Sequence, residues 1–183
     1  MQLKGKRIVI TGVSEGIGRE LALQLAKEGA QLALAARSLD KLREVCEACT
    51  SFGATAHPVK ADVSVEGDCE RIIEEAAARL GGLDILVNNA GVSFMKRLQD
   101  CPDTSAYEKV MAVNYLGAVY CTYYALPHLK QSKGLIVAVS SGQGKTGFPG
   151  FTAYAASKYA MHGFFDSLRI ELEDDGVDVQ IVC

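Results

Sequence analysis

The stretch Thr11-Gly12-Val13-Ser14-Glu15-Gly16-Ile17-Gly18 decides the fold, because it joins an apolar run to an amphipathic one. Residues 7–11 have the pattern of a buried strand, and residues 16–28 place apolar side chains at helical spacing. Between a strand and a helix, Gly12 permits a tight turn, Gly16 lets backbone approach a pyrophosphate, and Gly18 lets the helix pack closely. The stretch therefore predicts a dinucleotide site, with an ordinary glycine-rich turn as the alternative.

The same alternation continues along the chain, where short apolar runs are followed by longer amphipathic runs. Several of the short runs are apolar on both faces, as strands of a parallel sheet covered by helices are. We therefore predict one α/β domain, residues 1–183, with a doubly wound parallel sheet. The expected strands are residues 7–11, 31–36, 54–60, 83–88, 134–140 and 178–182, and the expected helices are residues 16–28, 38–52, 65–80, 104–130 and 151–174.

The composition excludes several classes of protein. Of the 183 residues, 49% are hydrophobic and 22% are charged, and the formal net charge is -3, which excludes a disordered chain and gives no basic block for nucleic acid. Residues 110–129 carry no formal charge and are long enough to span a membrane, but they include Asn114, Pro127 and His128. We predict a buried or interface helix there, no signal peptide, and a cytoplasmic protein.

The six cysteines do not indicate a disulfide framework, because the chain is long enough to form its own core. Cys46 and Cys49 form a C-x-x-C in the middle of a predicted helix, away from a helix start where a reactive thiolate is favoured. We interpret them as half-buried helix residues rather than redox or metal-binding groups, and we predict no metal site.

The end of the second predicted strand indicates which nicotinamide cofactor binds. NAD sites usually place a carboxylate about 20 residues after the glycines, for the ribose 2′-hydroxyl. Here the strand ends in Ala35-Ala36-Arg37-Ser38, without an acid. Arg37 offers a planar set of donors to a 2′-phosphate and Ser38 adds a hydroxyl, which favours NADP(H). NAD(H) stays possible, because Glu15 brings negative charge to the same place and the alternative for Arg37 is a solvated surface residue.

Tyr154 and Lys158 are four residues apart near the start of a predicted helix, so their side chains lie on one face. A nearby ammonium stabilises a tyrosinate, and such a tyrosine can exchange a proton with a substrate oxygen near neutral pH. Ser140 and Ser141 end the preceding strand, at the edge of the sheet where ligands bind. Tyr154 and Lys158 taken alone fit a surface pair, but downstream of a dinucleotide turn they favour catalysis.

Together these motifs resemble those of the short-chain dehydrogenase/reductase family over the whole chain. Residues 11–18 resemble its T-G-x-x-x-G-x-G turn, and Asn88-Asn89-Ala90-Gly91 resembles the N-N-A-G that supports the sheet beside the cofactor. Asp62-Val63 resembles the pair that contacts adenine, and Tyr154-Ala-Ala-Ser-Lys158 resembles the tyrosine–lysine motif. The resemblance implies a Rossmann-like sheet of six strands in the order 3-2-1-4-5-6, with helices on both faces.

The resemblance also implies a catalytic tetrad of Asn114, Ser141, Tyr154 and Lys158. Tyr154 is then the acid and base, Lys158 assists it and holds the nicotinamide ribose, and Asn114 keeps a water that links Lys158 to solvent. Ser141 lies thirteen residues before the tyrosine, the family spacing for the serine that steadies the carbonyl oxygen. The cofactor-binding residues predicted in all are Gly12, Ser14, Glu15, Gly16, Ile17, Gly18, Arg37, Ser38, Asp62, Val63, Asn89, Ala90, Gly91, Tyr154 and Lys158.

The implied activity is an NADP(H)-dependent interconversion of a ketone and a secondary alcohol in a homodimer or homotetramer. An apolar pocket for a lipid-like or steroid-like substrate, or mere core and lid packing, is expected from Phe94, Leu98, Phe148, Pro149 and Phe151. Family members usually continue after residues 178–182 with a substrate loop, a helix and a last strand, which we expect to be missing here. The alternatives are a non-catalytic nucleotide-binding protein and, with a poorer match in glycine spacing, a related epimerase or dehydratase.

Overall fold

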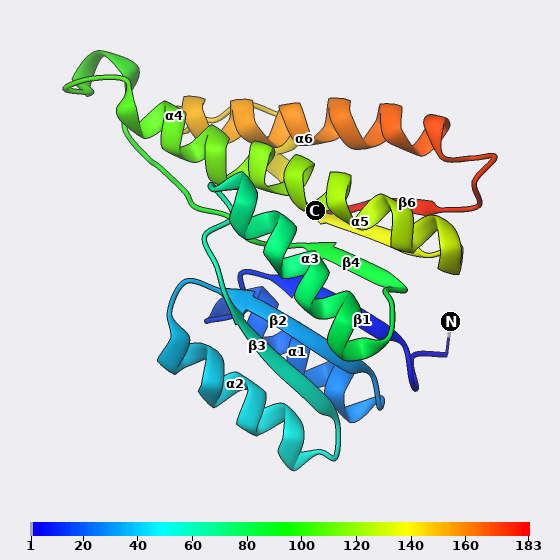
Figure 1. Cartoon of the computed structure of the whole chain (residues 1–183). Helices are drawn as coiled ribbons and strands as arrows, with labels where there is room; N and C mark the ends of the chain where they lie inside the picture. Colours follow the sequence, from blue (N-terminus) through cyan, green and yellow to red (C-terminus); the bar gives the residue numbers. More distant parts are fainter. Residues whose placement is uncertain (1) are drawn as a thin grey trace.

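Six apolar runs form one parallel sheet in the order β3-β2-β1-β4-β5-β6 in the computed structural model, which describes residues 2–183 (Figure 1). The centre of the sheet is the most apolar part, because Ile8, Val9 and Ile10 are fully buried on both of its faces. The predicted strand order and doubly wound architecture are confirmed. The strands are β1 (Arg7–Thr11), β2 (Gln31–Ala36), β3 (Thr55–Lys60), β4 (Ile85–Asn88), β5 (Leu135–Val139) and β6 (Asp178–Val182).

Helices cover both faces of the sheet, because neighbouring residues of each strand point to opposite sides. Helices α1 (Gly16–Lys27) and α2 (Leu39–Ser51) pack on the face that presents Ile8 and Ile10. Helices α3 (Glu66–Leu80), α5 (Gly117–Ser132) and α6 (Thr152–Glu171) pack on the face that presents Val9. The predicted and observed ends of α1, α2, α3 and α6 differ by no more than three residues, as expected for helix termini that fray.

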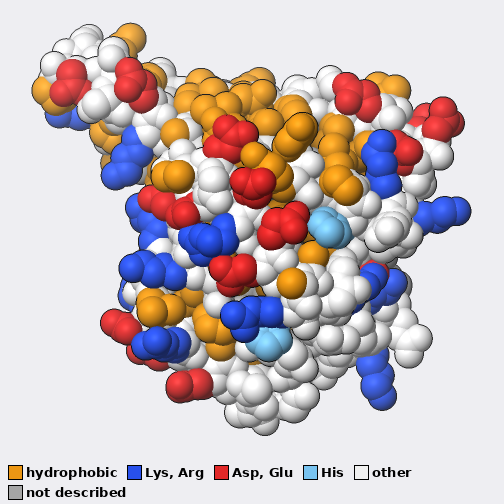
Figure 2. All heavy atoms as spheres, in the orientation of Figure 1, with side chains coloured by type: hydrophobic (Ala, Val, Ile, Leu, Met, Phe, Trp, Pro, Cys, Tyr) orange, Lys and Arg blue, Asp and Glu red, His pale blue; other side chains and the backbone are white. Residues whose placement is uncertain are grey.

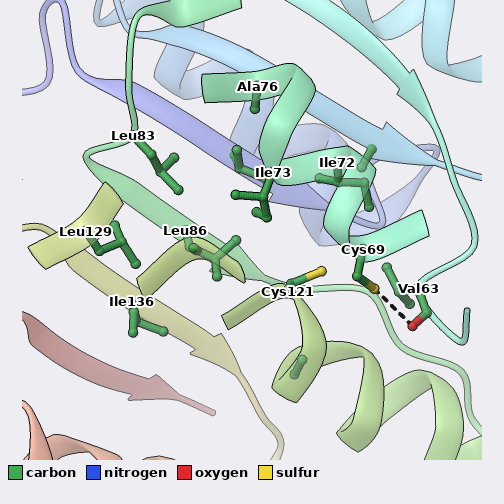
Figure 3. Packing of buried hydrophobic residues seen from close by; sticks show 14 of the residues in the cluster. Val63, Cys69, Ile72, Ile73, Ala76, Leu83, Leu86, Cys121, Leu129 and Ile136 are labelled. Carbon is green, nitrogen blue, oxygen red and sulfur yellow. Dashed lines mark hydrogen bonds between the residues drawn. The ribbon is translucent and has the colours of Figure 1, made fainter. Parts of the chain in front are cut away.

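Figure 3 shows how α3 and α5 meet over β4 and β5, with Ile73 of α3 directed toward Leu86. Cys69 and Cys121 face each other at this contact, and Cys69 Sγ donates to the backbone carbonyl of Val63 at 3.3 Å. The hydrogen bond with Cys69 and burial together raise the pKa of the Cys121 thiol well above its usual value. Cys121 is therefore a neutral part of the core, and Cys69 fills the space beside it.

Cys46 and Cys49 lie on the sheet-facing side of α2 and are buried, rather than half-buried as the sequence predicted. Burial raises the pKa of the Cys46 thiol to about 12 and that of the Cys49 thiol in the same direction. Thiols that stay protonated at neutral pH are poor nucleophiles and poor metal ligands. Within residues 2–183, no group of three or more His, Cys, Asp and Glu side chains is placed to hold a metal ion.

The helix predicted over residues 104–130 is present, but it is not α-helical throughout. A short helix, α4 (Ser105–Met111), passes into a π-helical segment, η2 (Ala112–Leu116), before α5 begins. Asn114 lies within η2 and binds the backbone of Val92 outside the helix, and a wide turn accommodates such a contact. Among the described helices, none is long and apolar enough to cross a membrane.

The turn between β1 and α1 packs directly against the loop that follows β4. Gly12 has a φ of 74°, and a Cβ at this position would lie 2.6 Å from Ala90 Cα. Any other residue would meet both a left-handed backbone penalty and a steric clash. Gly5 has nearly the same φ, 76°, but a Cβ there would meet open space.

We therefore expect Gly5→Ala to lower the free energy of unfolding by about 1–2 kcal/mol, the penalty for a left-handed residue. Gly12→Ala should cost about 1–3 kcal/mol more, because overpacking adds to the backbone penalty. Urea unfolding followed by circular dichroism measures both values. Equal losses in the two variants would show that the Gly12–Ala90 contact is not close.

Candidate active site

Two side chains join the carboxyl ends of β1 and β4. These neighbouring strands lie at the point where the strand order of the sheet reverses. Thr11 Oγ1 accepts hydrogen bonds from the backbone N–H groups of Asn89 and Ala90, each at 3.1 Å. Asn89 Nδ2 donates in return to the carbonyl oxygens of Thr11 and Gly12, at 2.9 and 3.0 Å. These bonds hold the glycine turn against the loop after β4, at the position where open α/β sheets bind ligands.

A cleft of about 340 Å³ lies along this edge of the sheet, a size found in small-molecule sites. The loops that follow β1, β2, β3 and β4 all contribute to it, so residues far apart in the sequence come together. Gly16 and Ser38 belong to the same loops but do not line the cleft itself. The predicted cofactor residues that do line it are Gly12, Ser14, Glu15, Ile17, Gly18, Arg37, Asp62, Val63, Asn89, Ala90 and Gly91.

The start of α1 suits a pyrophosphate. Among the described residues, α1 has no side-chain cap hydrogen bond and no acid in its first turn, so its first N–H groups are open to an anion. Gly18 brings the helix close to the turn, because a Cβ there would touch Asn89 Nδ2 and lie 2.5 Å from the Gly12 carbonyl oxygen. The residues present therefore fit a dinucleotide at this turn.

Lys41 of α2 balances the acidic side chain of the glycine turn. Its Nζ donates to Glu15 Oε2 at 2.9 Å, and both side chains are exposed. The hydrogen bond and charge of Lys41 lower the pKa of the Glu15 carboxyl. Since Glu15 and Arg37 line the same cleft, the pair reduces the negative charge that a phosphate beside Arg37 would meet.

Arg37 also borders a second hollow of about 320 Å³, together with Lys60 and Arg71. The Arg71 guanidinium donates to the Lys60 carbonyl at 2.9 Å and to Asp68 at 2.7 Å, which fixes its position. Within residues 2–183, Arg37 has no ion-pair partner of its own. Its guanidinium is therefore available to an anionic group at the end of β2.

A smaller space of about 210 Å³, here called the reactive hollow, adjoins the cleft. Tyr154 and Lys158 of α6 line it, which brings together the two residues that the sequence places on one helix face. The Lys158 Nζ lies 5.6 Å from the centroid of the Tyr154 ring. The residues that line both the hollow and the cleft are Ile17, Asn89, Gly91 and Val92.

Lys158 is only 3% exposed, an unusual environment for an ammonium group. Its Nζ donates to the Val139 carbonyl oxygen at 2.8 Å and contacts Met161 Sδ at 3.6 Å. Burial lowers the pKa of Lys158 to about 8, because the charged form loses its hydration. Lys158 is thus mostly charged at neutral pH but close to its titration range, as suits a group that passes protons.

Asn114 is fully buried and does not line the cleft or the reactive hollow. Its Oδ1 accepts from the Val92 N–H at 2.7 Å, and its Nδ2 donates to the Val92 carbonyl oxygen and to Ser157 Oγ, each at 3.0 Å. A Cβ on Gly91 would lie 3.5 Å from Asn114 Oδ1 and 3.8 Å from Lys158 Nζ, so the glycine separates these two groups without filling the space.

Ser140 and Ser141 differ in where their hydroxyl groups lie. Ser140 lines the reactive hollow, but its buried Oγ faces the turn at Gly144, where a Cβ would lie 2.9 Å from Ser140 Oγ and 2.6 Å from His162 Cδ2. Ser141 Oγ accepts from the Gln143 N–H at 3.3 Å at the start of the 3-10 turn η3 (Gly142–Gly144). Of the two hydroxyl groups, that of Ser140 is the one enclosed by protein.

Apolar side chains from two loops flank the start of α6. Phe151 packs edge-on against Tyr154, with ring centroids 6.4 Å apart, and Phe94 packs edge-on against Tyr107 at 6.3 Å. The Lys96 N–H donates to the Gly150 carbonyl at 2.8 Å and joins the two loops. Leu98 and Phe148 are 61% and 57% exposed, so these two are not core residues.

Three features of this site escape the sequence patterns. The Glu15–Lys41 pair has no motif, although Lys41 falls in the first turn of a predicted helix beside the end of β2. The π-helical segment around Asn114 has no sequence signal that we recognise. Ser157 is visible only as the residue before Lys158, and its contacts depend on a residue 43 positions away.

The buried ammonium of Lys158 predicts a pH dependence of stability. Because burial lowers its pKa from 10.5 to about 8, the folded chain binds fewer protons than the unfolded chain between these values. The free energy of unfolding should therefore rise with pH across this window, by about 3 kcal/mol in total at about 1.4 kcal/mol per pKa unit.

Lys158→Met should lack this rise, whereas Lys109→Met, at an exposed position of α4, should keep it. Urea unfolding is measured in buffers from pH 7 to 11, about one pH unit apart. It gives the difference in free energy of unfolding between each variant and the parent chain at each pH. Parallel curves for the parent and Lys158→Met would mean that Lys158 keeps its hydration in the folded chain.

Residues 6–183 match the family model of short chain dehydrogenases. The chain is 44% identical over 182 residues to 11-beta-hydroxysteroid dehydrogenase-like 4A of Arabidopsis thaliana, a match that covers 99% of this chain and 60% of that protein. It is 42% identical over 172 residues to 11-beta-hydroxysteroid dehydrogenase A of Sesamum indicum, covering 93% of this chain and 49% of that protein. The chain thus spans less than two thirds of the length of either relative.

A solved structure from Sinorhizobium meliloti 1021, described as a short-chain alcohol dehydrogenase, superposes with a TM-score of 0.93 at 32% sequence identity. The superposition covers 97% of this chain and 71% of that one. The family model, the relatives and this structure agree with the resemblance that the glycine turn and the Tyr154–Lys158 motif carry. The chain belongs to the short-chain dehydrogenase family.

Proposed function

We propose that this protein is an oxidoreductase that interconverts a ketone and a secondary alcohol with a nicotinamide cofactor. The observation that carries the proposal is the reactive hollow of Tyr154 and Lys158, which shares four lining residues with the dinucleotide cleft. A substrate beside Tyr154 is therefore also beside the cleft. The dehydrogenase names of the relatives support the same reaction.

The cofactor and the four tetrad residues have separate roles in this proposal. The bound cofactor supplies or accepts the hydride. Tyr154 donates a proton to the carbonyl oxygen in reduction and takes it back in oxidation. The Lys158 ammonium stabilises negative charge on the Tyr154 oxygen and binds the nicotinamide ribose, and its pKa of about 8 lets it return a proton. Ser141 donates to the substrate oxygen, and Asn114 keeps a proton path to Lys158 open.

NADP(H) is the cofactor that we propose. Arg37 lies at the end of β2, lines both the cleft and the neighbouring hollow, and is available to a 2′-phosphate. The charge of Glu15 opposes such a phosphate, but Lys41 neutralises it at 2.9 Å. Lys41 therefore belongs to the cofactor site as the residue that makes Glu15 compatible with NADP(H).

A lipid-like or steroid-like ketone or alcohol is the substrate class that we propose. Phe151 and Phe94 stand beside Tyr154 and Tyr107, and the exposed Leu98 and Phe148 extend an apolar surface near the start of α6. Apolar walls with few polar groups are typical of sites for such molecules. Relatives named as hydroxysteroid dehydrogenases favour the same class.

We further propose a cytoplasmic homodimer or homotetramer. Figure 2 shows hydrophobic side chains gathered over the region of α4, α5 and α6, and the exposed ones there include Leu116, Tyr123 and Tyr159. Exposed aromatic residues are typical of subunit interfaces. The free cysteines support a reducing compartment.

Tyr154→Phe should lower kcat by about 10²–10⁴, the usual contribution of a general acid, while NADPH affinity changes little. Ser141→Ala should lower kcat as well, and Ser140→Ala should not, because the Ser140 hydroxyl is enclosed by the turn at Gly144. NADPH oxidation with a panel of ketones measures kcat, and fluorescence titration measures affinity. Near-parent kcat in Tyr154→Phe would exclude Tyr154 as the acid, and NADPH binding without any turnover would favour a non-catalytic nucleotide-binding protein.

Arg37→Ala should weaken NADPH binding by about 1.5–3 kcal/mol, the range for a hydrogen bond to a charged group, and leave NADH nearly unchanged. Lys41→Ala should also weaken NADPH selectively, because it leaves the Glu15 carboxylate unpaired beside the phosphate. Glu15→Ala combined with Lys41→Ala should restore most of the loss. Fluorescence titration at two salt concentrations gives the constants, and equal affinity of the parent for both cofactors would contradict the NADP(H) assignment.

Replacing Tyr123 with Asp should dissociate the oligomer, because a carboxylate is costly in an apolar interface. Sedimentation velocity without detergent measures the size of the parent and the variant, and Lys27→Asp on α1, on the opposite face of the sheet, serves as the control. A monomeric parent would remove the interface over α5.

A further inference from the structure

Ser157 is not one of the four tetrad residues, yet its hydroxyl lies between two of them. The side chain is fully buried and directly precedes Lys158 in the Tyr154–Lys158 motif. Its Oγ donates to the Tyr154 carbonyl oxygen at 2.7 Å and accepts from Asn114 Nδ2 at 3.0 Å. One hydroxyl therefore connects the helix that carries Tyr154 to the π-helical segment η2.

Asn114 extends this connection to the loop after β4. It binds both backbone groups of Val92, the N–H at 2.7 Å and the carbonyl at 3.0 Å, and Val92 lines both the cleft and the reactive hollow. The Asn114 amide thus uses its oxygen and both of its N–H groups in hydrogen bonds. Its side chain therefore has one favourable orientation. The path runs from Val92 through Asn114 and Ser157 to the backbone of Tyr154.

A hydroxyl on a short side chain is what this path requires. The hydroxyl is short enough to reach the carbonyl one turn back on its own helix, and that bond turns an oxygen lone pair toward Asn114. Alanine would leave one Asn114 N–H without its partner in a buried place, which is costly. Ser167 on the same helix offers a comparison. Its Oγ donates to the Gly163 carbonyl at 2.8 Å, but the residue is exposed and its side chain makes no hydrogen bond outside the helix among the described residues.

We propose that Ser157 is a positioning residue that fixes Tyr154 and Lys158 relative to the Gly91–Val92 floor of the cofactor cleft. It touches neither the cleft nor the hollow and acts through Asn114 and the Tyr154 backbone. The kinetic consequences rest on the proposed function, whereas the coupling of Ser157 to Val92 is a property of the fold alone.

Three variants separate the hydroxyl from the volume of the side chain. Ser157→Ala removes the hydroxyl, Ser157→Cys keeps nearly the same volume with a much weaker hydrogen-bonding group, and Ser157→Thr keeps the hydroxyl. Ser167→Ala is the matched control, because it removes a hydroxyl bonded only within α6.

Amide hydrogen exchange tests the coupling without any activity. In Ser157→Ala and Ser157→Cys, the Val92 amide should exchange at least about 10-fold faster relative to the Ile10 amide of β1, since local opening frees Val92 without unfolding the sheet. Ser157→Thr and Ser167→Ala should match the parent. If the Val92 and Ile10 amides accelerate together, Ser157 contributes only to global stability and the proposal is wrong.

Steady-state kinetics test the consequence for the reaction, with NADPH and phenanthrenequinone as the probe ketone. Ser157→Ala and Ser157→Cys should lower kcat by about 10- to 100-fold, the effect of a small misplacement, with little change in the KM for NADPH. The pH midpoint of the rate should also move, and Ser157→Thr should restore both. Unchanged kcat and pH midpoint, with faster Val92 exchange, would contradict the positioning role. A parent chain with no turnover would contradict the proposed function, while the exchange result still decides the coupling.

Discussion

The hydrogen bonds between Thr11 and Asn89 are the constraint on which the site depends. They join the end of β1 to the end of β4. The side chain of each residue is hydrogen-bonded to the backbone at the end of the other strand. The close contact of Gly12 with Ala90 follows from this tie. Because the strand order reverses between β1 and β4, the two loops diverge above the tie and leave the cleft open.

The chemistry of the site is positioned by buried polar groups that cost stability. Lys158 loses hydration in the core, and it is held there by the Val139 carbonyl rather than by an acid. Asn114 is also buried. Its amide is fully hydrogen-bonded, but it lies in the π-helical segment that separates α4 from α5. The large apolar layers on both faces of the sheet offset these costs, and the polar groups converge on the single edge where Tyr154 lies.

Much of the fold follows from local patterns in the sequence. Strands β1, β2 and β6 have the predicted ends, because each is a short apolar or alternating run between clear turn signals. Tyr154 and Lys158 meet at the hollow because a spacing of four residues fixes one helix face. The glycine turn reaches the cleft for a similar reason, since its place after the first strand determines where it lies.

Contacts between distant residues are what the patterns miss. The wide turn at Asn114 depends on Val92, and the role of Ser157 depends on Asn114, so neither has a local signal. The negative charge of Glu15 by itself disfavours a phosphate at this place. Only the structure shows that Lys41 lies close enough to Glu15 to neutralise that charge. The family spacing favours Ser141 over Ser140, but only the structure shows that the packing of Gly144 against His162 encloses the Ser140 hydroxyl.

The proposed function requires a nicotinamide cofactor in the cleft between the β1 and β4 loops. Titration of the isotope-labelled chain with NADPH, followed by amide NMR, tests this directly. We expect saturable shifts of the amide signals of five residues that line the cleft: Gly12, Ile17, Arg37, Gly91 and Val92. Shifts confined to the opposite edge of the sheet, around Ile170 and Val177, or no saturable shifts at all, would contradict it.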